Sequence, residues 1–335
     1  MTTFTHRLGI LVGLSAVGYV LSFCSQLIIS YHFGTSSALD AYWAGLALVN
    51  LLCFYLHPLR EALVPAIHRE GLAGPAQAGR MLFAGFVLLG ALVIGSSMIL
   101  WTCATTLATW MVPDGDVRAM EAILLVLPWL IPYMGLFVFS EALNSVLLSL
   151  DRAVFQSVGR LVTSIVLLAV LMACGAGLGV PALVLAQMAS MAVSMALCIV
   201  ALRAVRIQPV RDVVQVLREG GVLPLFLSLL GNYVLAQLYV VGERAAMIHL
   251  SGGLVSAYQY STSLVNVIVT LLAYPLANLL WPRFLASGDA NDLSRAGMVA
   301  ARSAALLFLA LSMACTFVWL HAEQIVFLLF SRGAF

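Results

Sequence analysis

The chain has 335 residues, of which 63% are hydrophobic and only 9% are charged. A soluble domain of this length needs more charge than this to cover its surface, so the composition predicts an all-α, polytopic membrane protein. The formal net charge of +2 argues against a nucleic-acid partner, because such a partner is bound by a concentrated basic surface.

Several common kinds of site are not indicated. The six Cys residues lie in or near apolar runs without a CxxC pair, which favours buried thiols over disulfides or a metal site. The sequence lacks the GxxxxGK[ST] phosphate loop, so we expect no bound ATP. Its extramembrane loops are too short for a catalytic domain. We therefore expect no cofactor and no enzymatic activity.

Nine apolar segments are long enough to cross a bilayer, whose hydrocarbon core needs about 20 apolar helical residues. Gly, Pro, Asp and Ser separate them, as expected for helix ends. The nine predicted spans are residues 8–31, 41–66, 81–101, 120–149, 154–173, 182–203, 223–248, 254–281 and 298–320.

The distribution of arginine predicts the orientation of these spans. Arginine is rare in alternate loops, where "HFGTSSALD" and "CGAGLGVPA" contain none and "VPDGDVR" contains only Arg118. Positive residues concentrate on the cytoplasmic side of membrane proteins, so we predict a cytoplasmic N-terminus. The arginine-bearing loops hold Arg7, Arg69, Arg80, Arg152, Arg203, Arg206, Arg211, Arg218, Arg283 and Arg295.

The longest polar stretch, 203–221, divides six spans from three. Its pattern predicts a cytoplasmic amphipathic helix on the membrane surface, with Val210, Val213, Val214 and Leu217 on one face. We therefore predict a six-helix bundle over 1–203, a linker over 204–221 and a partial second bundle over 222–335. Because the sequence stops at "FLLFSRGAF", we also expect that further spans follow in a longer protein.

Some spans carry charges that a passive membrane helix would not tolerate. A charge at the bilayer centre costs about 2.5–3.5 kcal/mol on insertion scales, so such groups usually face a bundle interior or a water-filled cavity. The candidate cavity residues are Arg60, Glu61, Glu141, Arg160, Glu243 and Arg244.

Structural roles compete with this interpretation. Arg160 can extend its charged end to the membrane surface, and Arg60 and Glu61 can neutralise each other. The Glu243–Arg244 pair can tie its span to another helix instead of facing a cavity.

Two stretches resemble the MurJ (MviN) flippase family. "FGTSSALDAYWAGLALVNLL" with "LREALVPAIHREG" is similar to its start, and "GERAAMIHLSGGLVSAYQYSTSLVNVIVTLL" is similar to its seventh and eighth helices. Asp40, Glu243 and Arg244 match positions of the family motifs. The resemblance implies two helical bundles facing a central cavity, in the superfamily of multidrug, oligosaccharidyl-lipid and polysaccharide exporters.

The resemblance also implies a function. MurJ proteins move lipid II, an undecaprenyl-pyrophosphate-linked glycan, across the bacterial cytoplasmic (inner) membrane. This sequence departs from the family at two cavity arginines of the first helix, which fall on Ser25 and Tyr31, and at an eighth-helix arginine, which becomes Ser263.

These departures leave several functions open. We expect a flippase working by alternating access on an undecaprenyl-pyrophosphate-linked glycan, with membrane lipid and a coupling ion or the membrane potential as further partners. The alternatives are export of an exopolysaccharide or O-antigen lipid-linked glycan, a multidrug cation antiporter, an intramembrane lipid-glycan enzyme, and a non-transporting scaffold.

Overall fold

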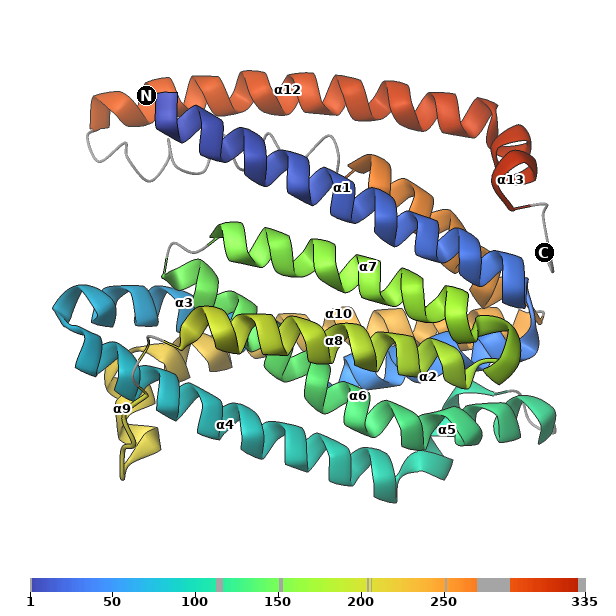
Figure 1. Cartoon of the computed structure of the whole chain (residues 1–335), viewed down its shortest axis with the longest axis horizontal. Coiled ribbons are helices and arrows are strands. Elements are labelled where there is room, and N and C mark those ends of the chain that lie inside the picture. Colours follow the sequence, from blue (N-terminus) through green and yellow to red (C-terminus); the bar gives the residue numbers. More distant parts are fainter. Residues whose placement is uncertain are drawn as a thin grey trace.

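The computed structural model describes residues 2–112, 117–150, 153–203, 205, 207–250, 252–269 and 290–330. Over these residues the chain is a stack of long, approximately parallel α-helices (Figure 1), which confirms the all-α prediction. The helices are α1 (Thr2–Phe33), α2 (Ser37–Leu52), α3 (Leu56–Ala73), α4 (Pro75–Thr102), α5 (Ala104–Met111), α6 (Val117–Ser149), α7 (Ala153–Leu178), α8 (Pro181–Leu202), α9 (Val213–Glu219), α10 (Val222–Leu250), α12 (Ala290–Leu320) and α13 (Ala322–Phe330). Residues 254–269 form a further helical segment.

The chain is a multi-pass membrane protein by the length and composition of these helices. Six described helices are long and apolar enough to cross a membrane, and two bent helix pairs raise the number to eight. These eight correspond to eight of the nine predicted spans. The remaining predicted span, 254–281, lies partly outside the described residues.

The second predicted span is broken into two helices. α2 and α3 meet at an angle of 46°, and residues 53–55 between them are not helical. Pro58 follows this break in the first turn of α3, where its missing N–H costs no intrahelical hydrogen bond. The break therefore lets the chain accommodate Pro58 while changing direction.

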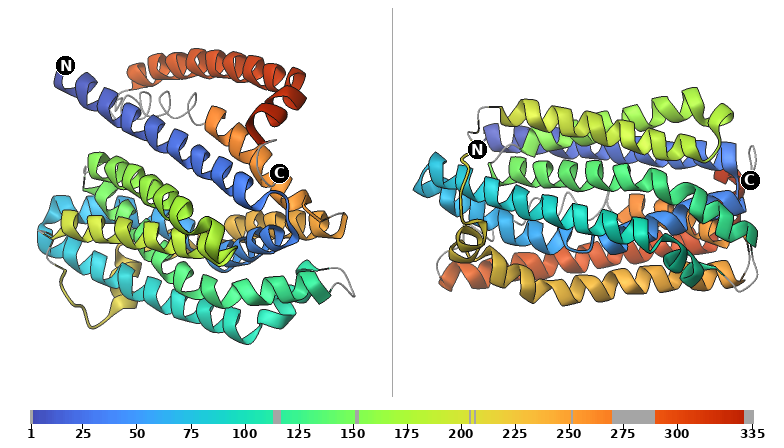
Figure 2. Two further views of the ribbon diagram at one scale, coloured as in Figure 1. Left: turned by 45° about the vertical axis from the view of Figure 1, so that its right-hand side comes forward. Right: turned by 90° about the horizontal axis from the view of Figure 1, so that it is seen from below.

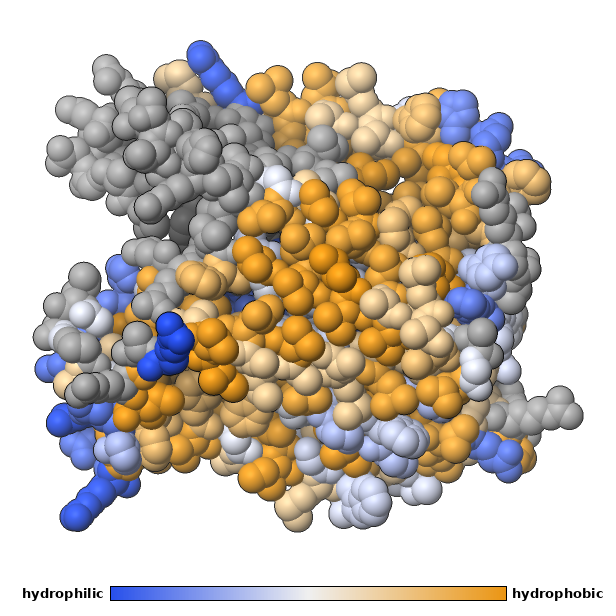
Figure 3. Space-filling view, viewed as in Figure 1, coloured by the Kyte–Doolittle hydropathy of each residue, from blue (hydrophilic) through white to orange (hydrophobic). Residues whose placement is uncertain are grey.

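Helices α1 to α8 pack mainly on one another. α1 lies on α7, α7 on α8, α8 on α6, and α6 on α2, while α3 packs on α4. Large apolar side chains fill the space between them, including the fully buried Leu48, Leu89 and Leu127. Figure 3 shows an apolar surface along the middle of the molecule and hydrophilic residues gathered toward its two ends, as expected for helices that cross a bilayer.

Helix α10 joins this group by lying along the bent pair α2–α3 (Figure 2). At the start of α10, the Arg69 guanidinium of α3 donates a 2.7 Å hydrogen bond to the carbonyl oxygen of Gly220. Further along α10, Tyr233 forms a hydrogen bond with Glu61 of α3. Beyond the end of α10, the Gly253 N–H donates to Asp40 of α2. One continuous seam therefore connects α2–α3 with α10.

The linker before α10 is less helical than predicted. Of its described residues, only those of the short α9 are helical, and residues 207–210 form no regular structure. Leu217 of α9 is buried, whereas Val214 is 63% exposed, so the four predicted apolar residues do not share one buried face. The Asp212 side chain begins α9 by accepting a 2.9 Å hydrogen bond from the Gln215 N–H, which is a typical helix cap.

Loops gather at two opposite ends of the molecule. At one end the Gln208 N–H donates a 3.3 Å hydrogen bond to the Gly79 carbonyl, which places the linker beside the α3–α4 turn. At the other end the Tyr260 hydroxyl donates to the Gly34 carbonyl over 2.8 Å. This grouping agrees with the alternation predicted from arginine, whose absolute direction stays a prediction. Arg152, Arg206, Arg283 and the loop 113–116 lie outside the described residues.

We predict that the Arg211 end is cytoplasmic and the Gly115 end is external. In a background in which Cys103 and Cys315 are replaced by serine, an impermeant thiol reagent added to intact cells should label Gly115→Cys and not Arg211→Cys. Arg211 is exposed, so its replacement disturbs no packing. Labelling of both positions in intact cells, or of Arg211→Cys alone, would refute this topology.

Candidate functional site at the junction of α2, α3 and α10

Asp40 forms the most extensive described polar contact across the seam. Its carboxylate lies in the first turn of α2 and is only 5% exposed. It accepts hydrogen bonds from the backbone N–H groups of Gly253 and Ser256, over 2.6 and 2.8 Å, and from the Ser256 hydroxyl. The first N–H groups of a helix have no partner within that helix, and a negative charge is favourable there. Asp40 therefore caps the helix 254–269 from a different part of the chain.

The backbone approaches closely around this cap. Gly253 has a φ of 85°, a conformation that favours glycine, and a Cβ atom there would lie 2.7 Å from the Thr35 carbonyl oxygen. The Tyr260 ring stacks on Phe330 of α13, with ring centroids 5.2 Å apart. The turn between α1 and α2 and the start of helix 254–269 thus form one compact contact, which we call the Asp40 contact.

We predict that Gly253→Ala destabilises this contact by more than about 1–2 kcal/mol. An alanine is sterically strained at a positive φ, and its Cβ atom would also collide with the Thr35 carbonyl. Gly252→Ala is the matched control, since a Cβ atom there meets no atom within 4 Å. Thermal unfolding in detergent should show a lower midpoint for Gly253→Ala and a near-native midpoint for Gly252→Ala. Equal midpoints for the two variants would contradict the geometry.

Arg244 lies on the other side of the same helix start. Its guanidinium donates to the Gln259 amide oxygen over 2.7 Å and to the Val255 carbonyl over 3.4 Å. It also lies 4.9 Å from the centre of the Tyr258 ring, within the range of a cation–π interaction. Within the described part of the chain, no carboxylate forms an ion pair with Arg244. Its hydrogen-bond partners are therefore neutral groups, and the carboxylates of Glu243 and Asp40 act on its charge only through space.

Glu243 forms no ion pair with Arg244 in the described chain, and the two side chains share the ring of Tyr258 as a neighbour. Its carboxylate accepts a 2.9 Å hydrogen bond from the hydroxyl of Tyr258, whose ring lies against Arg244. Adjacent helical residues point about 100° apart, which explains why the two charges do not pair directly. Glu243 thus fixes the aromatic surface on which the guanidinium rests.

Glu61 contacts α10 at a second point of the seam. The Tyr233 hydroxyl donates a hydrogen bond to the Glu61 carboxylate. The Tyr233 ring also stacks on His57, one turn earlier on α3, with centroids 5.5 Å apart and an interplanar angle of 12°. Glu61 therefore binds across the seam instead of pairing with its neighbour Arg60.

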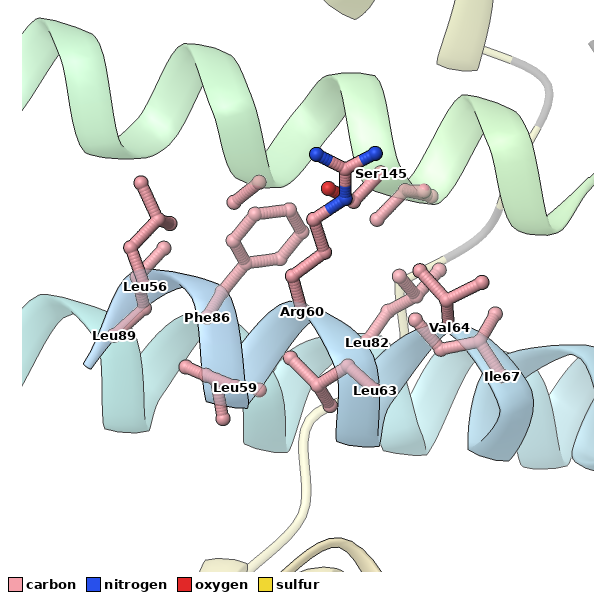
Figure 4. Close-up of a pocket in the computed structure, with 13 residues that line it drawn as sticks. Leu56, Leu59, Arg60, Leu63, Val64, Ile67, Leu82, Phe86, Leu89 and Ser145 are labelled. Atoms are coloured by element: carbon pink, nitrogen blue, oxygen red, sulfur yellow. The ribbon is translucent and has the colours of Figure 1, made fainter. Parts of the chain in front are cut away.

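Arg60 points away from this contact. Figure 4 shows its side chain reaching from α3 toward α6, where Ser145 lies. It lines an apolar cavity of about 30 Å³ together with residues such as Leu63 and Phe86. Among the residues that the structure describes, Arg60 makes no ion pair.

The other two candidate residues lie elsewhere. The Arg160 guanidinium on α7 donates to the Tyr19 hydroxyl of α1 over 2.8 Å and stacks over the same ring at 5.5 Å. Glu141 lies half-buried on α6, and its carbonyl accepts from the Ser145 hydroxyl. The structure thus brings Asp40, Glu243 and Arg244 together around one helix start and separates them from Arg160 and Glu141.

The positions at which the sequence departs from the MurJ pattern have local contacts. Ser25 is fully buried and donates to the Leu21 carbonyl of its own helix over 3.1 Å. The Ser263 hydroxyl donates to the Gln259 carbonyl over 2.7 Å, whereas Tyr31 is 56% exposed. These three positions therefore bring no cation to helix 254–269, whereas Arg244 contacts this helix through Gln259.

Comparisons with known proteins identify the fold. No family model and no curated protein matches the chain. An inward-facing multidrug resistance MATE family transporter of the MOP superfamily matches with a TM-score of 0.71 and 17% identity, covering 97% of this chain and 76% of that one. The lipid II flippase MurJ in an inward closed conformation matches with a TM-score of 0.75 and 12% identity, covering 97% and 68%. This chain has the fold of MOP-superfamily transporters.

A third solved structure shows how the pocket varies within this fold. It is a MOP-superfamily transporter from Pyrococcus furiosus, with a TM-score of 0.61 and 18% identity over 96% of this chain and 73% of that one. It is described as having a binding pocket of reversed polarity that suggests a different function. The MOP fold alone therefore does not fix the charge of the substrate, which has to be argued from the residues of each chain.

Proposed function

We propose that this chain is a flippase that moves a lipid-linked oligosaccharide across the bacterial inner membrane by alternating access, with lipid II as the leading substrate. The observation that carries the proposal is the state of Arg244. This guanidinium lies in an apolar helix at the seam and is held by neutral partners, so its positive charge is left for an anion. Burying such a charge is costly, and a function in binding accounts for that cost.

The chemistry of a lipid-linked glycan fits this arrangement. A pyrophosphate and sugars do not cross hydrocarbon unaided, whereas the polyprenyl tail remains in the lipid. A planar guanidinium can bind two phosphate oxygens at once, which an ammonium group does not do. Arg60, which lies between α3 and α6, supplies a second cation without a described ion pair.

The movement in this proposal takes place at the seam. We propose that residues 1–203 and 222–335 act as two lobes joined by the linker, and that the Asp40 contact closes the external end in one state. Breaking that contact while the opposite end closes would expose the substrate to the other side of the membrane. The membrane potential or a coupling ion can drive the return, since one charge moving through 100 mV is worth about 2.3 kcal/mol.

Export of organic cations is a second candidate, and two carboxylates favour it. Glu61 and Glu243 accept hydrogen bonds from tyrosine hydroxyls and form no ion pair in the described chain. Carboxylates beside aromatic rings are suitable ligands for a cationic drug. Export of an exopolysaccharide or O-antigen precursor differs from lipid II flipping only in the glycan.

The experiment that separates these functions uses reconstituted vesicles. Protein is incorporated into liposomes containing fluorescent lipid II, a fluorescent undecaprenyl-pyrophosphate tetrasaccharide, or a cationic dye in the lumen. A flippase should move the glycan headgroup between leaflets without altering it, and the dye should stay in the lumen. Dye export without movement of either glycan lipid would favour the cation exporter and overturn our proposal.

A further inference from the structure

A second cavity lies beside the linker and shares Leu82 and Phe86 of α4 with the cavity at Arg60. It has a volume of about 220 Å³ and lies where α4, α6 and α8 approach the linker. Its walls are Leu82, Phe86, Leu143, Val146, Ile199, Leu202, Arg203, Val205 and Ile207. Eight of these nine residues are apolar, and the ninth is a single arginine.

Such a cavity favours an apolar occupant over water. Buried water needs two to four polar partners, and an apolar protein cavity of about 150 Å³ stays dry and binds apolar molecules. Ile199 and Ile207 are 53% and 54% exposed, so the cavity is bordered by side chains that face the surroundings of the helices. For Ile199, which lies within α8, those surroundings in a bilayer are acyl chains.

The single arginine lies at the membrane-surface end of the cavity. Arg203 is the residue immediately after α8, and its exposed side chain makes no ion pair within the described residues. The linker crosses this end, where the Gln208 N–H is bound to the Gly79 carbonyl. Arg80, also exposed, follows Gly79 directly, so a second cation is present at this end of the fold.

We propose that this cavity binds one anionic phospholipid, with an acyl chain between α4, α6 and α8 and the headgroup phosphate at Arg203. The apolar walls account for the chain, and the unpaired arginine at the surface end accounts for the phosphate. Because residues 205 and 207 form part of the wall, the bound lipid would hold the linker against α4. This site is separate from Arg244 and does not depend on the transported substrate.

Native mass spectrometry of the detergent-solubilised protein tests this proposal. The protein is mixed with phosphatidylglycerol or with zwitterionic phosphatidylcholine of the same acyl chains. The wild type should retain one phosphatidylglycerol in preference to phosphatidylcholine. Arg203→Gln should lower the retained phosphatidylglycerol by about fivefold, as expected for one cation near an anionic headgroup. Arg218→Gln, at an exposed arginine of α9 outside the cavity, should retain it like the wild type.

A second variant and a labelling experiment address the acyl chain. Leu143→Phe should fill the cavity and reduce retention of both lipids, whether or not Arg203 is present. Phosphatidylglycerol with a photoreactive acyl chain should label peptides of α4, α6 or α8 in the wild type. This labelling locates the acyl chain even if Leu143→Phe does not fold. Equal retention by Arg203→Gln and the wild type, or labelling confined to other helices, would overturn the proposal. Displacement of the lipid by equimolar undecaprenyl phosphate would also overturn it, because the site would then belong to a polyprenyl lipid.

Discussion

Arg244→Ala is expected to lower the rate of lipid-linked glycan flipping per folded molecule by about 100-fold. The substitution removes a guanidinium that can make two charge-assisted hydrogen bonds to pyrophosphate, which together are worth about 3 kcal/mol. The Tyr258 ring and the Gln259 amide, which position Arg244, remain in place. Arg244→Lys should also impair flipping, because it keeps the charge and loses the planar fork.

Two further variants test whether Arg244 acts in substrate binding or in stabilising the fold. Arg218→Ala, at an exposed position on α9, should flip at the wild-type rate. Gln259→Ala removes a neutral partner of Arg244 and should cost less than Arg244→Ala. The rates are measured in vesicles and divided by the amount of folded protein. If Arg244→Ala only reduced the protein level and left the normalised rate unchanged, Arg244 would have no part in transport.

Asp40→Ala is expected to open the end of the seam at which the Asp40 contact lies. It leaves the buried Gly253 and Ser256 N–H groups without their acceptor, at a cost of about 1–3 kcal/mol for each. The loss should raise the amide hydrogen exchange of residues 253–256 by roughly 100-fold, since about 2.7 kcal/mol corresponds to that factor. Asp40→Asn should fall between the wild type and Asp40→Ala, because its amide retains one oxygen acceptor.

The exchange measurement has an internal control. The buried hydroxyls of Ser140 and Ser194 join α6 to α8 over 2.9 Å, far along the chain from Asp40. Peptides around these two residues should exchange at the wild-type rate in Asp40→Ala. Faster exchange throughout the protein would indicate general unfolding, and unchanged exchange at 253–256 would show that Asp40 does not hold the contact.

Hydropathy predicted the helices well because the backbone N–H and C=O groups of each span must form hydrogen bonds within that span in lipid. α4, α6, α7 and α8 lie close to their predicted ranges for this reason. The break between α2 and α3 was not predicted, because hydropathy does not register a change of direction. Pro58 was a signal for it, since a proline is best tolerated in the first turn of a helix.

The candidate site was harder to predict, since its contacts join residues distant in sequence. Asp40 caps a helix more than two hundred residues away, and no local pattern specifies such a partner. The partners of Glu243 and Arg244 had a simpler signal. Each partner lies 15 residues later in the sequence, just beyond the short turn after α10, which brings Tyr258 and Gln259 of the next helix within reach of the two charges.

Locking the Asp40 contact tests the central claim most directly. In a background without other cysteines, Ser37→Cys and Gly252→Cys are bridged by a short disulfide-containing crosslinker, because both positions are exposed beside the contact. If alternating access at this seam moves the glycan, bridging should stop the flipping of fluorescent lipid-linked glycan, and reduction should restore it. Each single-cysteine protein treated in the same way should remain active. Flipping that continues at the full rate in the bridged protein would contradict the account.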